Sequence, residues 1–282
     1  MLPLEGKLVS RHKGEYAGPC PFKGIGDDRF HVWAGASNWY CRKECRDCPG
    51  QSCPAGGRRG WFKGAEIVTF RVLPPPERPK MSRVWEYHRN LDGQVLGYLA
   101  SRGIRRDIAS RFLVGKHGHR LTIPCIVRNG HNVCYGIKKR WIGDPPEPWI
   151  DRYTMEPGSQ GKAIFNYDRL ASQPWSYVVI VEGVLDCILL DQMGIPATAP
   201  FGGGGVWDPK WARAYRRVRL PIVVADWDKP NGQGKRAGTV DAIRKLQSLG
   251  RGILVFPPGG HKDIGEAYLA GENIRGWIAS LL

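Results

Sequence analysis

Two uninterrupted apolar runs in the C-terminal part of the chain constrain its fold most strongly. They read Tyr177-Val-Val-Ile-Val181 and Leu220-Pro-Ile-Val-Val-Ala225, and such runs are typical of strands buried on both faces of a sheet. Shorter apolar runs lie at 195–201 and 252–256. Segments with helical spacing lie between or after these runs, at 184–193, 208–217, 235–249, 263–270 and 273–281. This alternation predicts a parallel sheet with helices on both faces.

The rest of the chain differs in character, so we expect several domains. Residues 73–80, Leu-Pro-Pro-Pro-Glu-Arg-Pro-Lys, exclude both helix and central strand and predict an extended linker. Helical spacing at 91–101 and 105–112 precedes two strands at 121–127 and 133–141. The predicted fold class is a multidomain α+β and α/β protein. Its expected parts are a small β domain at 1–72, a linker at 73–82, a basic subdomain at 83–172 and an α/β subdomain at 173–282.

Charge points to a polyanionic partner. The 282 residues carry a net charge of +16, and such a surplus favours binding to nucleic acid. Residues 71–170 hold 18 basic and 9 acidic side chains, the largest share of the surplus. The chain shows no apolar run of membrane-spanning length and no signal-peptide core at its start, so we expect a cytoplasmic protein without a membrane partner.

Carboxylates stand at the ends of the two apolar runs. Glu182 closes the first run, and Asp226 and Asp228 close the second. Ligands of open α/β sheets bind beyond the carboxyl ends of the strands. Acids gathered there repel one another unless a cation lies between them, and oxygen ligands suit Mg²⁺ or Mn²⁺. The alternative is that they are helix caps and turn formers. Asp186, one helical turn after Glu182, is a further candidate.

These segments resemble the Toprim signature shared by DnaG-type primases, topoisomerases and some nucleases. The resemblance rests on Val-Val-Ile-Val-Glu-Gly-Val-Leu-Asp at 178–186, on Val-Val-Ala-Asp-Trp-Asp at 223–228, and on Gly232, Gly234 and Ala237. It implies that Glu182 acts as general acid or base and that Asp226 and Asp228 hold the catalytic Mg²⁺ or Mn²⁺, with Asp186 as the family's further acid.

The basic middle segment resembles the N-terminal subdomain of the DnaG-type polymerase core. The matching stretches are Arg102-Gly-Ile104, Arg111-Phe112, Leu121-Thr-Ile-Pro124, Tyr135-Gly-Ile-Lys-Lys-Arg140 and Gly161–Leu170. Cations here can track a nucleic-acid backbone or neutralise triphosphates. The candidates for binding nucleic acid or nucleotide are Lys138, Lys139, Arg140, Arg120, Lys162 and Lys229. Taken singly, each could equally be a solvated surface charge.

Five of the eight cysteines lie near the N-terminus, at Cys20, Cys41, Cys45, Cys48 and Cys53. Clustered thiols in a cytosolic protein suggest a metal site, and four of these five could hold a structural Zn²⁺. The surrounding residues resemble the zinc ribbon that precedes the core of phage and bacterial primases. Lys23 departs from that pattern, because the family has a second ligand there, and His31 could also take part. An iron–sulfur cluster on the last four cysteines is the alternative.

Other side chains of the N-terminal region leave their role open. Trp33, Trp39 and Tyr40 could stack bases or form the core of a small domain. The remaining cysteines, Cys125, Cys134 and Cys187, are expected to be core thiols.

Together these patterns predict a primase that makes short RNA primers on single-stranded DNA from NTPs. No Walker loop is present in the sequence, so a separate helicase is the expected partner. A Toprim nuclease, which would activate water with the same acids, is the enzyme alternative, and a topoisomerase is disfavoured for want of a strand-passage domain. A non-catalytic nucleic-acid-binding module is the third possibility, although acids beside phosphates would not help binding.

Overall fold

The computed structural model describes residues 77–128, 131–147, 150–203, 205–228 and 237–282, together with seven strands in the first 76 residues. Contacts divide the chain into two compact units. The first unit joins Met1–Glu77 and Pro145–Gly158, and the second unit joins Arg78–Asp144 and Ser159–Leu282. None of the described helices has the length and apolar character to cross a bilayer.

The first unit is built on a seven-stranded sheet in the order β5-β6-β4-β3-β2-β1-β7. Neighbouring strands run antiparallel except β1 and β7, which are parallel. The strands are β1 (Glu5–Ser10), β2 (Glu15–Gly18), β3 (Phe30–Trp33), β4 (Asn38–Cys41), β5 (Gln51–Ser52), β6 (Arg58–Trp61) and β7 (Arg71–Val72). The segment 145–158 contains β11 (Tyr153–Met155), which is not a strand of this seven-stranded sheet. Trp39 is buried and its ring lies 5.2 Å from that of Phe30, so Trp39 belongs to the core of this unit.

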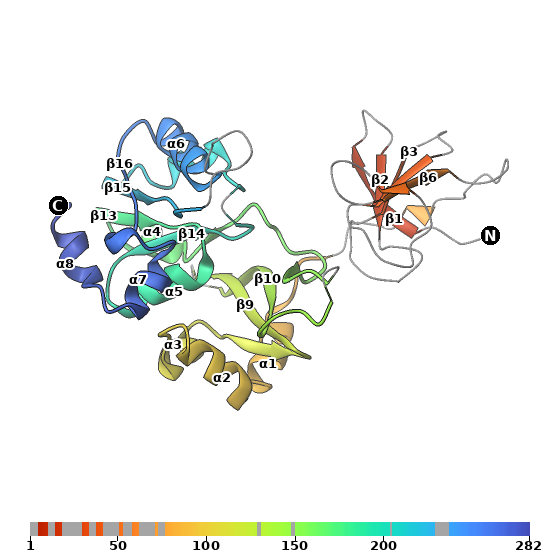
Figure 1. The fold of residues 1–282 in the computed structure, drawn as a ribbon, viewed down its shortest axis with the longest axis horizontal. Helices are drawn as coiled ribbons and strands as arrows, with labels where there is room; N and C mark the ends of the chain where they lie inside the picture. Colours follow the sequence, from red (N-terminus) through yellow and green to blue (C-terminus); the bar gives the residue numbers. More distant parts are fainter. Residues whose placement is uncertain are drawn as a thin grey trace. The chain divides into compact units, whose positions relative to one another are not determined.

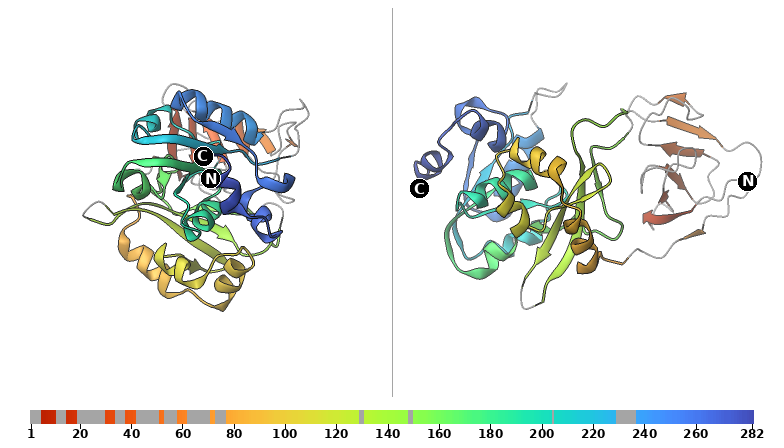
Figure 2. Two further views of the ribbon diagram at one scale, coloured as in Figure 1. Left: turned by 90° about the vertical axis from the view of Figure 1, so that its left-hand side faces the viewer. Right: turned by 90° about the horizontal axis from the view of Figure 1, so that it is seen from below.

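The second unit opens with helices packed on an antiparallel sheet (Figure 2). The helices are α1 (Met81–Arg89), α2 (Gly93–Ala100) and α3 (Arg106–Arg111), and the strands β8 (Gly115–His117), β9 (Arg120–Val127) and β10 (Val133–Trp141). Val84 and Tyr87 of α1 are buried against Ile126 and Ile137 of the sheet. This packing explains why α1 begins at Met81, inside the predicted linker 73–82, where prolines alone suggested extended chain.

The larger sheet of the second unit has the order β12-β14-β13-β15-β16. Its strands are β12 (Ile164–Phe165), β13 (Trp175–Ile180), β14 (Ala197–Pro200), β15 (Val218–Val224) and β16 (Ile253–Val255). They run parallel except β12, which is antiparallel to β14 at one edge. The predicted parallel sheet is therefore present, with one added antiparallel edge strand.

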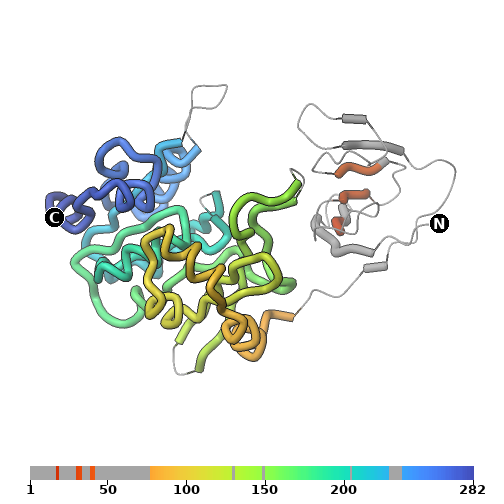
Figure 3. The backbone as a smooth tube through the Cα atoms, turned by 60° about the horizontal axis from the view of Figure 1, so that its bottom comes forward, coloured from red at the N-terminus to blue at the C-terminus, as the bar shows by residue number. Residues whose placement is uncertain are grey.

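Helices cover both faces of this sheet (Figure 1). They are α4 (Asp168–Ser172), α5 (Val184–Gln192), α6 (Ala237–Leu249), α7 (Ile264–Leu269) and α8 (Ile274–Ala279), with short 3₁₀ turns η1 (Pro209–Arg213) and η2 (Pro258–Gly260). Ala242 and Leu249 of α6 pack with Val178 and Val223 of the strands in one core cluster. Figure 3 follows the described backbone of this unit from α1 to α8.

The predicted helix at 208–217 is wrong, because only the short 3₁₀ turn η1 forms there. The chain turns instead of continuing as a helix, since the carbonyl of Tyr215 accepts hydrogen bonds from the Val218 backbone N–H at 2.8 Å and from the Arg251 guanidinium at 2.7 Å. β15 consequently starts at Val218, two residues before the predicted strand.

Candidate active site

Glu182 and Asp226 emerge from neighbouring parallel strands at the same edge of the sheet. β13 and β15 pair with Ile180 opposite Val223, and each acid follows the last residue of its strand by two positions. The backbone beyond β15 stays extended, because the Ala225 N–H donates to the Val255 carbonyl at 3.0 Å and the Trp227 N–H to the Lys262 carbonyl at 2.7 Å. Side chains of an extended segment alternate, which turns Asp226 and Asp228 to one side and the exposed Trp227 to the other.

The first turn of α6 closes over Glu182. At Gly238 a Cβ atom would lie 2.7 Å from Glu182 Oε1, 2.9 Å from the Asp226 carbonyl oxygen and 3.2 Å from the Asp226 nitrogen. A glycine is therefore required for this approach. Among the described residues, Glu182 Oε1 is buried without a hydrogen-bond partner. The carboxylate therefore lies under this turn of backbone, with one oxygen to which no described residue donates a hydrogen bond.

Burial is the main cause that raises the pKa of both acids. The pKa of Asp226 rises to about 8, chiefly through loss of hydration and then through Glu182, Asp186, Asp263 and Asp228. The pKa of Glu182 also rises through burial, although Lys245 and the Asp226 backbone N–H oppose the shift. Such a pair is stable with a proton or a cation between its members and costly without either.

Asp186 lies in the first turn of α5, where its Oδ1 accepts a hydrogen bond from the Gly265 N–H at 3.1 Å. Burial and the neighbouring Asp263 raise the pKa of Asp186 to about 7, and Arg102 opposes the shift. Asp263 also caps α7 by accepting from the Glu266 N–H at 2.8 Å. The resemblance had included Asp186, whereas Asp263 was not foreseen, because a capping Asp gives no separate sequence signal.

Carboxylate oxygens suit a hard divalent cation, and the metal site at these acids stays a prediction. Within the described part of the chain, no three Asp, Glu, His or Cys side chains converge closely enough to form a metal's ligand set as they stand. The unpartnered Glu182 Oε1 and the raised pKa of Asp226 nevertheless fit a cation-binding group. Asp228 is the third predicted metal ligand, and its Oδ1 lies 3.6 Å from Lys262 Nζ.

Lys245 is a residue of this site that the sequence analysis missed. It is fully buried on α6, and its Nζ has no hydrogen-bond partner among the described residues. Burial lowers its pKa, while Glu182, Asp241 and Asp226 act in the opposite direction. The signal was available, because Gly238, Ala242, Lys245 and Leu249 form the buried stripe of α6. A lysine within an otherwise apolar stripe indicates that acids lie near enough to offset its charge, as Glu182, Asp241 and Asp226 do here.

Two of the predicted cationic residues are buried in the described structure. Lys138 and Arg140 alternate along β10 and are 7% and 4% exposed, which excludes a solvated surface role for both. Lys138 Nζ lies 5.8 Å from the ring centroid of Phe201, and burial lowers its pKa to about 8. The guanidinium of Arg140 lies 4.6 Å from the ring centroid of Tyr98. Lys139, between them, is half-buried.

The other cationic candidates are more scattered. The guanidinium of Arg120 lies 4.9 Å from the ring centroid of Trp141. Lys162 is exposed just before β12, in a different part of the second unit. Lys229 lies outside the described residues. Their roles in binding nucleic acid or nucleotide stay predictions.

The predicted zinc ligands fall almost entirely outside the described residues. Cys20, Cys45, Cys48 and Cys53 lie there, and Cys41 is buried at the end of β4. His31 is buried in β3, with its ring 6.2 Å from that of Tyr40. The zinc site therefore stays a prediction. The three predicted core thiols, Cys125, Cys134 and Cys187, are buried as expected.

Comparison with known proteins identifies the fold. No family model and no curated protein sequence matches the chain. Solved structures do match: a DnaG primase catalytic domain bound to single-stranded DNA aligns with 71% of this chain and 76% of its own, at 19% identity and a TM-score of 0.55. The primase fragment of the bacteriophage T7 primase-helicase aligns with 95% of this chain and 99% of its own, at 15% identity and 0.52.

A third match is the Aquifex aeolicus primase, represented by its zinc-binding and RNA polymerase domains. It covers 95% of this chain and 79% of its own, at 16% identity and a TM-score of 0.52. The second unit therefore has the fold of the DnaG-type primase core.

Proposed function

We propose that this chain, whose fold is that of the DnaG-type primase core, is a DNA primase that makes short RNA primers on single-stranded DNA. The observation that carries the proposal is the partly buried pair of Glu182 and Asp226 at the carboxyl edge of the parallel sheet, with both pKa values raised. Acids in this position are what the Toprim resemblance predicted, and a primase needs them for nucleotidyl transfer.

In the proposed reaction, the 3′-hydroxyl of the growing RNA attacks the α-phosphorus of an incoming NTP and pyrophosphate leaves. The hydroxyl proton must go to a base, and the Glu182 carboxylate is the proposed acceptor, because burial raises the pKa of this group. Asp226, Asp228 and Glu182 would hold Mg²⁺ or Mn²⁺, which supplies stabilisation of the negative charge on the phosphates.

The partners follow from the same proposal. One structural neighbour is a DnaG primase domain bound to single-stranded DNA, which supports a DNA template for this chain. NTPs are the substrates, and a separate helicase is the proposed replication partner. A Zn²⁺ on four of the five N-terminal cysteines, in a ribbon like that of known primases, would stabilise the first unit, and a cytoplasmic location suits all of these partners.

Primer synthesis tests the proposal directly. The full chain is incubated with single-stranded DNA, labelled NTPs and Mg²⁺ or Mn²⁺, and short RNA products are resolved on a gel. We expect Glu182→Gln and Asp226→Asn to reduce product about 100-fold or more, since each removes a charge from the reacting centre. Glu86→Gln, an exposed acid on α1, is the matched control and should leave synthesis unchanged.

Two outcomes would overturn the proposal. The first is that the wild type makes no RNA on any template, and the second is that both acid variants make as much as the wild type. Cleavage of the DNA without NTPs, abolished by the same two substitutions, would assign the site to a nuclease.

A further inference from the structure

A fully buried lysine lies beneath α6, next to the acids of the candidate active site. Lys245 is 0% exposed, whereas lysines are almost never fully buried unless a partner offsets their charge. It belongs to the buried stripe of α6 with Gly238, Ala242 and Leu249, on the helix that packs against β15 and β16 (Figure 1). The other three residues of the stripe carry no charge, so Lys245 brings the only formal charge of this stripe into the core.

The geometry of α6 directs this charge toward Glu182. Gly238, in the first turn, is the residue of the stripe that approaches Glu182 Oε1. Lys245 follows Gly238 by seven residues, which is roughly 10 Å along the helix axis. Long side chains of a helix lean toward its N-terminus, and Ala242, one turn before Lys245, has only a methyl group. The lysine side chain therefore extends along the stripe toward the turn that covers Glu182.

The electrostatics of the two groups agree with this placement. Burial lowers the pKa of Lys245, and the groups that oppose the shift are Glu182, Asp241 and Asp226, in that order. Burial also raises the pKa of Glu182, and Lys245 is the first of the groups that oppose that shift. Each residue is thus the leading charged neighbour of the other.

Lys245 acts on the acids through space, without a direct ion pair. In the described part of the chain, neither Lys245 Nζ nor Glu182 Oε1 has a hydrogen-bond partner. Lys262, the other lysine beside the acids, lies 3.6 Å from Asp228 with its side chain 52% exposed, so water and salt screen its charge. The charge of Lys245 is screened much less, because the residue is buried.

We propose that Lys245 is a positioning residue of the acidic site, an internal counter-ion that offsets the repulsion between Glu182 and Asp226 and opposes the binding of a divalent ion to them. The inference rests on the proposed function for the divalent ion. When that ion is absent, the ammonium is the positive charge that faces the two carboxylates. When the ion is bound, two positive charges face the same carboxylates and repel each other, so the acids hold the ion less tightly than they would without Lys245.

Binding of Mn²⁺ to the full chain tests this opposition, because the EPR signal of free Mn²⁺ is lost when the ion binds. Asp226→Asn identifies the relevant site as the binding that this substitution removes. Lys245→Met keeps the length of the side chain and removes its charge, and it should lower the Kd for Mn²⁺ at this site about tenfold. Lys245→Arg keeps the charge and should bind Mn²⁺ nearly as the wild type does. Lys80→Met, at an exposed position before α1, is the matched control and should leave the Kd unchanged.

Unfolding in urea gives a second readout of the same coupling. In buffer without added divalent ions, Lys245→Met should lower the equilibrium constant for folding. Saturating Mn²⁺ should reduce this loss about tenfold, because binding and folding belong to one thermodynamic cycle. A lysine with a merely structural role would give the same loss with and without Mn²⁺.

A double variant keeps the inference testable if Lys245→Met does not fold. Glu182→Gln/Lys245→Met removes both charges and should be more stable than Lys245→Met alone in buffer without added divalent ions. A double variant no more stable than Lys245→Met would overturn the inference. So would a Kd for Mn²⁺ that is unchanged or raised in a folded Lys245→Met, or a wild type that binds no Mn²⁺ at the acids.

Primer synthesis by the wild type, measured separately, reports on the proposed function. A chain that makes RNA but shows no effect of Lys245→Met on Mn²⁺ binding would refute the counter-ion alone. Tighter Mn²⁺ binding in Lys245→Met, together with a wild type that makes no RNA, would support the counter-ion and refute the primase.

Discussion

At the scale of single residues, Asp226 determines the behaviour of the candidate active site. Its pKa of about 8 means that the folded protein binds a proton there more tightly than the unfolded chain does. Between about pH 4, the ordinary value for Asp, and pH 8, raising the pH removes this proton and destabilises the fold. The metal-free protein should therefore lose stability across this pH range.

Asp226→Asn should remove the part of this loss that Asp226 causes, because asparagine keeps the shape and carries no charge, while the raised pKa values of Asp186 and Glu182 leave the remainder. Without divalent ions at pH 8, we expect the variant to be more stable than the wild type by about 2 kcal/mol, with the difference fading toward pH 5. Urea unfolding in EDTA at both pH values measures it. Glu86→Gln is the control, and a stability gain equal at both pH values would contradict the prediction.

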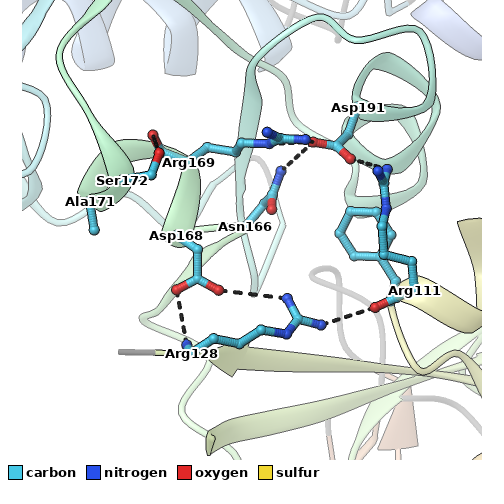
Figure 4. Close-up of a pocket in the computed structure, with 9 residues that line it drawn as sticks. Arg111, Arg128, Asn166, Asp168, Arg169, Ala171, Ser172 and Asp191 are labelled. Carbon is cyan, nitrogen blue, oxygen red and sulfur yellow. Dashed lines mark hydrogen bonds and ion pairs between the residues drawn. The ribbon is translucent and has the colours of Figure 1, made fainter. Parts of the chain in front are cut away.

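At the scale of elements, Asp191 joins three helices of the second unit. It lies in the last turn of α5, its side chain is 2% exposed, and it accepts hydrogen bonds from Arg111 of α3 and Arg169 of α4. Figure 4 shows both guanidiniums directed at this one carboxylate, with Asn166 beside them. The basic helical region and the α/β sheet are thus linked by a shared acid as well as by apolar packing.

Asp191→Ala should be costly for that reason. Breaking a buried pair typically costs 3–5 kcal/mol, and because both arginines are partly exposed we expect about 2 kcal/mol here. Denaturant unfolding of the full chain measures the loss. Asp107→Ala, which removes the partner of the exposed Arg105, should change stability little. Equal effects of the two substitutions would show that the buried network is not a link between elements.

Elements were predictable from sequence where burial dictated the pattern. β9, β10, β13 and α6 lie within two residues of their expected ranges, because continuous apolar runs and 3.6-residue spacing report burial directly. The helix at 208–217 was wrong, since nothing local shows that Arg251, more than 30 residues later, would bond the Tyr215 carbonyl. β8, β12 and α4 are too short to show periodicity.

The acids of the site were visible at strand ends, whereas Lys245 and Asp263 needed tertiary structure to reveal them.

At the scale of the whole molecule, the first unit provides a test of the predicted metal content. Four of the five candidate cysteines lie outside the described residues, and the thiol set predicts one Zn²⁺ per chain. The purified full chain should contain close to one equivalent of zinc by elemental analysis, lost when Cys41 and Cys45 are both replaced by Ser. Iron with visible colour would favour the iron–sulfur cluster. The absence of both zinc and iron would contradict the zinc-ribbon prediction.

The close approach of Gly238 to Glu182 and Asp226 also bears on how far sequences of this fold can diverge. Glu182 is held by a glycine backbone and by strand register, and few neighbouring side chains are needed for its placement. Substitutions around the site can therefore accumulate without moving the reacting atoms. A chain built in this way can share its architecture with a solved structure at 15% identity. The likeness is then visible in the three-dimensional course of the backbone and hardly at all in the amino-acid sequence.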